Sequence, residues 1–444
     1  QRLHRRLRRR RRRQHPAARH ERRGSHRQRA QAPQHRRGSP THRHGVGGRV
    51  KGARKGRARD EGVGRRLAGR PARLRVGVQR AEQQVDERLA PVSTLSRLLR
   101  RPELGALAGL VAVILFFALA ADPVMFSMAG LINFMTPASQ LGILALGAAL
   151  LMVGGEFDLS IGSMVAFAGL IFGTAVTLLN LPLGIAVLLT LAVGLALGWI
   201  NAQIVLRTAL PSFIVTLAWL FILRGLSLVG LKWATDGSTQ MRGIDEAVAG
   251  DMFLGIFSGE AFQPAFSWMA NAGWIASFAN GQPTVTGVPV EIVWFACLTL
   301  ITTWVLLRTP AGNWIFAAGG DAKAAMNSGV PVRRIKISLF MLAASCAALV
   351  AIITVLSSGS TDARRGFQKE FEAIIAAVIG GCLLTGGYGS AVGAFLGSII
   401  FGIVMIGLTY TSIDQDWYLV FLGGMLLVAV LFNNIIRKRV TGER

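Results

Sequence analysis

Residues 151–173 read LMVGGEFDLSIGSMVAFAGLIFG: an apolar run stops at two glycines, a short polar stretch follows, and a second apolar run begins after a serine. Residues 383–402, LLTGGYGSAVGAFLGSIIFG, repeat this order. Paired apolar segments interrupted by glycine are typical of the substrate path of membrane transporters, because the backbone groups freed at the break can line a cavity. Small residues also let helices pack closely, which is the alternative interpretation of both segments.

Apolar runs of membrane-spanning length surround these two segments. A stretch of about 20 apolar residues crosses a hydrocarbon core about 30 Å thick. The sequence contains ten such runs, at 104–121, 139–154, 160–179, 182–203, 211–231, 289–307, 337–357, 373–386, 391–410 and 416–436. We therefore predict an all-α fold, a polytopic transmembrane helical bundle of about ten spans with pseudo-repeated Gly-interrupted helices. The run at 373–386 is short and rich in glycine, so it either spans the membrane or is re-entrant.

Basic residues are divided unevenly between the loops. With ten spans, both ends of the chain lie on one side of the membrane. Placing the ends inside gives ten Lys and Arg in the internal loops and five in the external loops, and an excess of basic residues marks the cytoplasmic side. We expect cytoplasmic N- and C-termini and a transmembrane domain at 104–436, with a cytoplasmic loop at 308–336, a periplasmic loop at 232–288 and a cytoplasmic tail at 437–444.

The positive charge of the chain is concentrated in its first hundred residues. The formal net charge is +26, and residues 1–100 hold 32 Lys+Arg against 6 Asp+Glu, whereas the rest of the chain holds 17 of each. Residues 1–80 contain no Ile, Phe, Trp, Tyr, Met or Cys, so they cannot bury enough apolar area to fold. We expect this Arg-rich extension to be disordered and non-native, the alternative being an arm that binds nucleic acid or anionic lipid. Residues 81–103 are expected to form a cytoplasmic N-terminal segment.

Two acidic residues, Glu156 and Asp158, fall between two apolar runs. A buried charge in such a position is costly unless it is paired or hydrated. Asp158 or Ser160 can accept the free N–H groups at the start of the following helix, which is a capping role. The alternative is that these side chains line the inner mouth of a path.

Polar side chains also interrupt the next two apolar runs. Asn201 and Thr216 either hydrogen-bond a polar solute or bond a carbonyl of a neighbouring helix. Pro211 stands at the first turn of the second of these helices, where proline is well tolerated. Arg224 lies about 20 Å farther along that helix, at 1.5 Å per residue. We expect its side chain to snorkel to the outer surface.

The stretch AGNWIFAAGGDAKAAMNSGVPVRRIKI, residues 311–337, is too polar to span the membrane. Gly-Gly-Asp followed by a good helix-forming stretch predicts a short helix capped by Asp321, and Gly329 and Pro331 predict its end. This helix should lie along the inner surface of the membrane between two spans. It is either an amphipathic interfacial helix or a lever on which a cytoplasmic partner pushes.

Four motifs together resemble a known family. GILALGAALLMVGGEFDLSIGS (142–163), PSFIVTLAWLFILRG (211–225), FAAGGDAKAAMNSGVPVRRIKI (316–337) and EFEAIIAAVIGGCLLTGGYGSAVGAFLGSIIFG (370–402) are similar to the hallmarks of membrane permease subunits of ribose-type, sugar-importing ABC transporters. They occur in the family's order over about residues 95–440. The sequence departs from the family at Glu156 with Phe157, where Gly-Ile-Asp is usual, and at 367–372.

The resemblance implies a permease that works in a pair, with a second copy or a sister permease, to carry sugar through the membrane lipid. It implies that an ABC ATPase, which binds ATP and Mg²⁺, docks on the coupling segment within 308–336, and that a periplasmic binding protein delivers sugar. The external loop 232–288 either docks that protein or covers the outer face. The family's coupling positions correspond here to Gly319, Gly320, Asp321, Ala324, Ser328 and Gly329. The signature positions are Gly154, Gly155, Asp158, Ser160, Gly162 and Ser163.

Five residues are weaker candidates for the sugar path: Asn133, Gln140, Asn201, Thr216 and Glu372. Asn133 and Gln140 match polar positions in the family's lead-in, and Glu372 stands at a predicted helix start. No catalytic residue, metal site or bound cofactor is expected in this chain, and no nucleic-acid partner. No Lys is followed by Ser or Thr, so the phosphate-binding motif of ATPases is missing.

Three other function classes remain to be weighed. An ion-coupled secondary transporter of a small polar solute needs a membrane-embedded carboxylate or His relay, but all seven His lie between His4 and His44 and the acidic residues of the body fall at span ends or in loops. An exporter of a hydrophobic solute is disfavoured by the sugar-permease motifs. An intramembrane enzyme is disfavoured because no nucleophile with a paired base is visible. The sequence does not indicate which sugar or polyol is carried.

Overall fold

The computed structural model describes residues 102–278 and 281–441. The chain divides into two units, 1–89 and 90–444, and all described residues belong to the second. The expectations for the Arg-rich extension at 1–80 and for most of the 81–103 segment therefore lie outside the described residues, as does the end of the tail at 442–444.

Each of the ten apolar runs contains a helix. These helices are α3 (Pro102–Ala120), α4 (Met128–Val153), α5 (Ile161–Thr177), α6 (Leu183–Thr208), α7 (Ser212–Ala234), α11 (Val290–Arg308), α14 (Val332–Ser358), α15 (Lys369–Ile379), α16 (Ala391–Gly407) and α17 (Trp417–Thr441). Seven helices in the described part are long and apolar enough to cross a membrane, judged by length and composition. α5 and the stretch Trp417–Leu431 of α17 are apolar but shorter. The prediction of a polytopic helical membrane protein is confirmed.

α15 differs from a full span. It has 11 residues, which at 1.5 Å each rise about 16 Å, roughly half of the hydrocarbon thickness. The predicted run at 373–386 is helical only as far as Ile379, because glycines follow and Gly381, Gly386 and Gly387 adopt positive φ angles. This segment is thus a half-helix continued by a glycine-rich turn.

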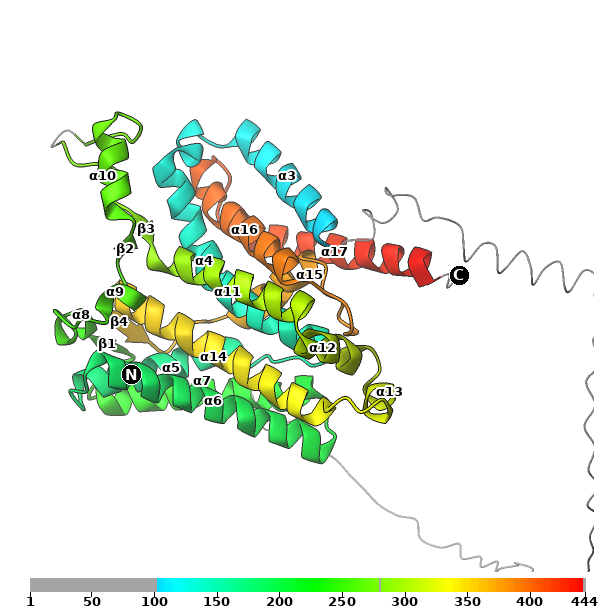
Figure 1. Ribbon diagram of the computed structural model, residues 1–444. Helices are drawn as coiled ribbons and strands as arrows, with labels where there is room; N and C mark the ends of the chain where they lie inside the picture. The colour runs from blue at the N-terminus through cyan, green and yellow to red at the C-terminus, as the bar shows by residue number, and fades with distance from the viewer. Residues whose placement is uncertain (1–101, 279–280, 442–444) are drawn as a thin grey trace, which may run out of the picture. The chain divides into compact units, whose positions relative to one another are not determined.

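The core is formed where long helices pack side by side. α14 packs against α6, α4 and α5, while α4 packs against α16, α15 and α11. Figure 1 shows this order, from α3 and α16 through α4, α11 and α14 to α6 and α7. α4 and α14 are buried along most of their length, whereas α3, α6 and α7 expose large apolar side chains, as helices facing lipid do.

Short elements fill the connections. Between α7 and α11 lie β1 (Gln240–Arg242), α8 (Ile244–Ala247), α9 (Leu254–Phe257), β2 (Glu260–Ala261), α10 (Gln263–Asn271) and β3 (Val288–Pro289). β4 (Ser360–Asp362) follows α14 and pairs antiparallel with β1, with Thr361 opposite Met241; β2 pairs with β3. The 3-10 turns η1 (Pro123–Phe126) and η2 (Leu408–Tyr410) and the helices α12 (Pro310–Gly320) and α13 (Ala322–Asn327) complete the described elements.

The loops gather at two ends of the helices. At the end that we call the glycine end, the Phe157 N–H donates to Ser212 Oγ at the start of α7, and Arg333 at the start of α14 donates to Gln203 near the end of α6. The opposite end, which we call the sheet end, holds the β1–β4 ladder, reached after the 23 residues of α7. The break after α4, the connection between α6 and α7 and the segment before α14 therefore share the glycine end. The basic-residue count assigns these loops to the same side of the membrane.

Candidate functional site

The break after α4 begins where the helix runs into two glycines. The Gly154 N–H still donates to Leu150 O at 3.0 Å, but Gly155 takes a φ of +80°, a left-handed conformation that ends helices and that glycine adopts without steric cost. Residues 156–160 then run without helix until α5 starts at Ile161. The first quoted motif therefore folds as a helix, a break and a second helix.

Asp158 organises the break from a buried position. The N–H and the hydroxyl of Ser160 donate to Asp158 Oδ1 at 2.7 and 2.5 Å, and the side chain is 3% exposed. The capping interpretation is not confirmed, because α5 has no side-chain cap at its N-cap residue Ser160 and Asp158 accepts the N–H of Ser160, one residue ahead of the helix. Ser163 Oγ donates to Ser160 O in the first turn.

Two path candidates, Asn201 and Thr216, meet at this same break. Asn201 Nδ2 donates to Ser160 Oγ at 3.2 Å, and the Leu159 N–H donates to Thr216 Oγ1 at 3.0 Å. Both side chains are almost fully buried. In this conformation Asn201 of α6 and Thr216 of α7 therefore satisfy polar groups of the break.

Glu156 ties the break to a third helix. Lys336 Nζ in the first part of α14 lies 2.5 Å from Glu156 Oε1, and both side chains are mostly shielded from solvent. Glu156, at which the sequence departs from the family motif, is thus paired with Lys336. The ion pair links the segment after α4 to the segment that follows the coupling helices.

The coupling segment forms two short helices, α12 and α13, whereas the sequence predicts one. Asp321 Oδ1 accepts the N–H groups of Lys323 and Ala324 at 2.9 and 3.0 Å, so Asp321 is the N-cap of α13. Five of the six predicted coupling positions are exposed: Gly320, Asp321, Ala324, Ser328 and Gly329. Ala318 and Ala325 turn inward and pack with Val332.

Gly319 faces inward, where glycines from three distant parts of the sequence meet. A Cβ atom on Gly155 would lie 3.1 Å from Gly319 Cα, and one on Gly386 would lie 2.7 Å from Gly155 Cα and from Gly319 O. A Cβ on Gly319 would overlap Val153 O. The Gly387 N–H donates to Val153 O at 2.9 Å. We call these four glycines with Val153 the glycine joint.

The remaining path candidates lie apart from the break. Asn133 Nδ2 donates to Tyr410 Oη at 3.2 Å in an exposed position, and Glu372 is paired with Lys369 at 2.5 Å. Gln140 is half-buried on α4 and hydrogen-bonds the carboxyl group of Glu291. The structure therefore brings together Asn201 and Thr216 but does not gather all five candidates into one site.

Two buried carboxylates were missed by the sequence reasoning. Glu291 in the first turn of α11 is 5% exposed, and Glu370 in the first turn of α15 is 4% exposed. Glu370 packs directly on the signature residue Gly162, where a Cβ atom would overlap its carboxylate. The available signal was the position of each acid at the start of an apolar run, the same signal that marks Glu372.

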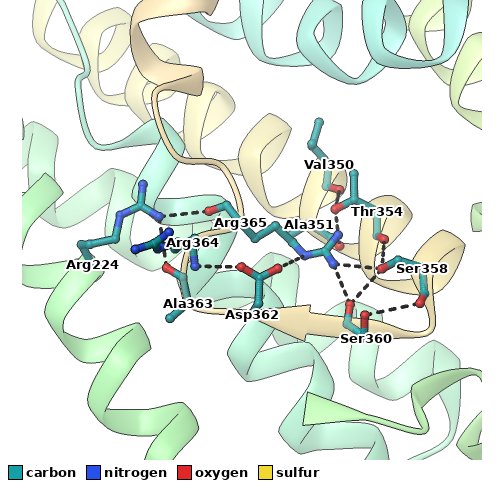
Figure 2. A network of polar contacts seen from close by, with 10 residues as sticks. All are labelled: Arg224, Val350, Ala351, Thr354, Ser358, Ser360, Asp362, Ala363, Arg364 and Arg365. Atoms are coloured by element: carbon teal, nitrogen blue, oxygen red, sulfur yellow. Dashed lines mark hydrogen bonds and ion pairs between the residues drawn. The ribbon is translucent and has the colours of Figure 1, made fainter. Parts of the chain in front are cut away.

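Arginines hold the loop that leads from α14 into α15 (Figure 2). Arg224 of α7 donates to the carbonyls of Ala363 and Arg365 at 3.2 and 3.1 Å, and to Gly366 O at 3.4 Å. Arg365 donates to Ser358 Oγ and Ser360 O. Arg224 is half-buried, and its guanidinium reaches the loop at the end expected to face outward, where it binds these carbonyls.

Comparison with known proteins places this arrangement in a family. Residues 130–430 match the family model described as branched-chain amino acid transport system / permease component. The chain belongs to this permease family. It is a transport subunit, not an ATPase, and a multi-pass membrane protein.

Individual relatives cover most of the permease. The ribose import permease protein RbsC of Escherichia coli K12 is 31% identical over 342 residues, which is 77% of this chain and 95% of the relative. The xylose transport system permease protein XylH of the same strain is 29% identical over 364 residues, 75% of this chain and 92% of the relative. RbsC of Haemophilus influenzae is 29% identical over 329 residues.

Proposed function

We propose that the chain is the membrane-spanning permease subunit of an ATP-driven ABC importer that carries a monosaccharide or a related polyol across the bacterial inner membrane. The observation that carries the proposal is the position of α12 and α13. One face of the α12–α13 pair is exposed, and the other face contacts the breaks at Gly155 and Gly387. The substrate class follows from relatives named for ribose and xylose, which align over 95% and 92% of their lengths.

The partner ATPase, which binds ATP and Mg²⁺, is proposed to dock on the exposed coupling residues Gly320, Asp321, Ala324, Ser328 and Gly329. The exposed side chain of Met326 on α13 adds an apolar contact to this surface. In this arrangement the glycine end faces the cytoplasm, together with the N- and C-termini.

The sheet end then faces the periplasm, where a sugar-binding protein delivers the substrate. Sugar passes between this chain and a second copy or a sister permease. Asn133, Gln140, Asn201, Thr216 and Glu372 remain the proposed polar contacts of the path. Because Asn201 and Thr216 already bond the break in this conformation, their contact with sugar requires that the break rearranges.

Sugar uptake in cells that contain both the permease and its ATPase, compared with cells that lack either one, tests the proposal. Radiolabelled D-ribose and D-xylose are supplied to cells that express the permease with its ATPase and to cells that lack the ATPase. We expect uptake of at least one sugar only when both are present. Uptake that survives loss of the ATPase would overturn the proposal in favour of an ion-coupled transporter. Titration of sugars against the cognate binding protein identifies the substrate.

A further inference from the structure

The glycine joint connects three parts of the chain that lie far apart in the sequence. Gly155 ends the break after α4, Gly319 belongs to α12 of the coupling segment, and Gly386 and Gly387 lie in the turn between α15 and α16. Both Gly-interrupted segments quoted at the outset therefore touch the coupling segment at one point. If these glycines served only to let two helices pack closely, a contact among three separate segments would not be needed.

Contacts in the joint run from backbone to backbone. No side chain lies between Gly155 and Gly319 or between Gly387 and Gly320, and the Gly387 N–H is bonded to Val153 O. Side chains absorb small displacements by changing rotamer, whereas directly packed backbone passes a displacement on. Gly155, Gly386 and Gly387 have φ angles of +80°, +81° and +73°, which other residues adopt only with strain.

We propose that the glycine joint makes the coupling segment and both helix breaks move as one body, so that Gly319 and Gly387 are positioning residues for transport. The inference rests on the proposed function and adds to it the point at which movement of α12 enters the membrane domain. From the joint, α4 and α16 carry the movement into the core, because these helices pack together along their length. The Glu156–Lys336 ion pair holds the same break to α14.

Two helical glycines provide a matched test. A Cβ on Gly319 overlaps Val153 O and lies 2.7 Å from Gly387 N, whereas a Cβ on Gly225 of α7 meets nothing within 4 Å. Gly319→Ala should therefore wedge the joint open, and Gly225→Ala should leave it unchanged. Each variant is purified with the ATPase that co-purifies from native membranes and reconstituted into vesicles with the binding protein.

Sugar uptake and ATP hydrolysis are measured together on these vesicles with D-ribose and D-xylose. We expect Gly319→Ala to retain the ATPase and its basal hydrolysis while uptake falls about tenfold or more, and Gly225→Ala to match the wild type. Wild-type uptake by Gly319→Ala, or loss of the ATPase from it, would overturn the inference. Absence of uptake by the wild-type complex would instead count against the proposed function.

A second measurement on the wild-type complex covers the case in which Gly319→Ala does not fold. Hydrogen exchange of the peptide containing Gly387 is followed with and without ATP trapped in the ATPase. If the joint moves as one body, the Gly387 amide stays protected in both states, because its bond to Val153 O persists. Fast exchange in either state would show that the joint opens, and the inference would be wrong.

Discussion

At the scale of single residues, the polar groups around the break after α4 illustrate how a membrane protein satisfies an interrupted backbone. Helix ends free N–H groups that water cannot reach in the bilayer. Asp158 and Thr216 accept two of these groups, from Ser160 and Leu159. Asn201 bonds the hydroxyl of Ser160. Residues that a sequence marks as solute contacts therefore also hold the scaffold of the break.

Replacement of Asp158 tests its acceptor role. Asp158→Ala leaves the N–H and hydroxyl of Ser160 without their acceptor, and we expect a loss of about 1–3 kcal/mol in stability. Asp158→Asn keeps an acceptor oxygen and should lose less. Thermal unfolding of the detergent-solubilised permease, followed by tryptophan fluorescence, measures both. Equal losses in the two variants would contradict the acceptor role.

Arg224 offers a second test at this scale. A guanidinium presents several donors in a fixed plane, whereas the lysine ammonium is a compact point charge that does not reproduce this geometry. We expect Arg224→Lys to lower stability by about 1–3 kcal/mol and to speed hydrogen exchange in residues 359–368. Arg242→Lys, at an exposed position of the same end, is the control. Unchanged exchange in Arg224→Lys would show that the three carbonyl contacts do not hold the loop.

At the scale of elements, two helix breaks and one pair of short helices form the functional unit. α15 is too short to span, and the glycine-rich turn after it brings Gly386 and Gly387 to the coupling segment. α13 has only six residues, which is far below the length at which isolated helices are stable. Its helical state therefore depends on its cap and on packing against α14.

The cap of α13 can be removed selectively. Loss of an N-cap side chain costs about 0.5–2 kcal/mol, so Asp321→Ala should fray α13 and weaken binding of the ATPase. Asp321→Ser retains a capping oxygen but loses the exposed carboxylate, so it should bind more tightly than Asp321→Ala and less tightly than the wild type. A quantitative pull-down of the ATPase on the immobilised permease compares both, with Lys323→Ala at an exposed site as control. Identical weakening by Ala and Ser would mean that the cap of α13 does not contribute to binding of the ATPase.

At the scale of the whole molecule, the loops sort into two ends that agree with the distribution of basic residues. The glycine end contains the coupling segment, and the sheet end contains the β1–β4 ladder. A membrane lying between these ends would separate them onto opposite sides. The orientation itself is a prediction from the excess of Lys and Arg in the loops of the glycine end.

Labelling of introduced cysteines tests this orientation. The native residues Cys297, Cys346 and Cys382 are first replaced by Ala. Asn327→Cys at the glycine end and Ala249→Cys at the sheet end are then placed at exposed positions. In intact spheroplasts a membrane-impermeant maleimide should label only Ala249→Cys, and permeabilisation should add Asn327→Cys. The reverse pattern would invert the proposed topology.

The sequence by itself determined the helical membrane fold, because apolar runs in lipid must satisfy their backbone groups within helices. It also located the coupling helix and its Asp321 cap, since both depend on residues next to each other in the chain. It did not reveal that Gly155, Gly319 and Gly387 meet, nor that Arg224 binds the carbonyls of the loop after β4. Only the tertiary structure decided these contacts, because which distant segments touch depends on how the long helices pack, and local patterns carry no record of that packing.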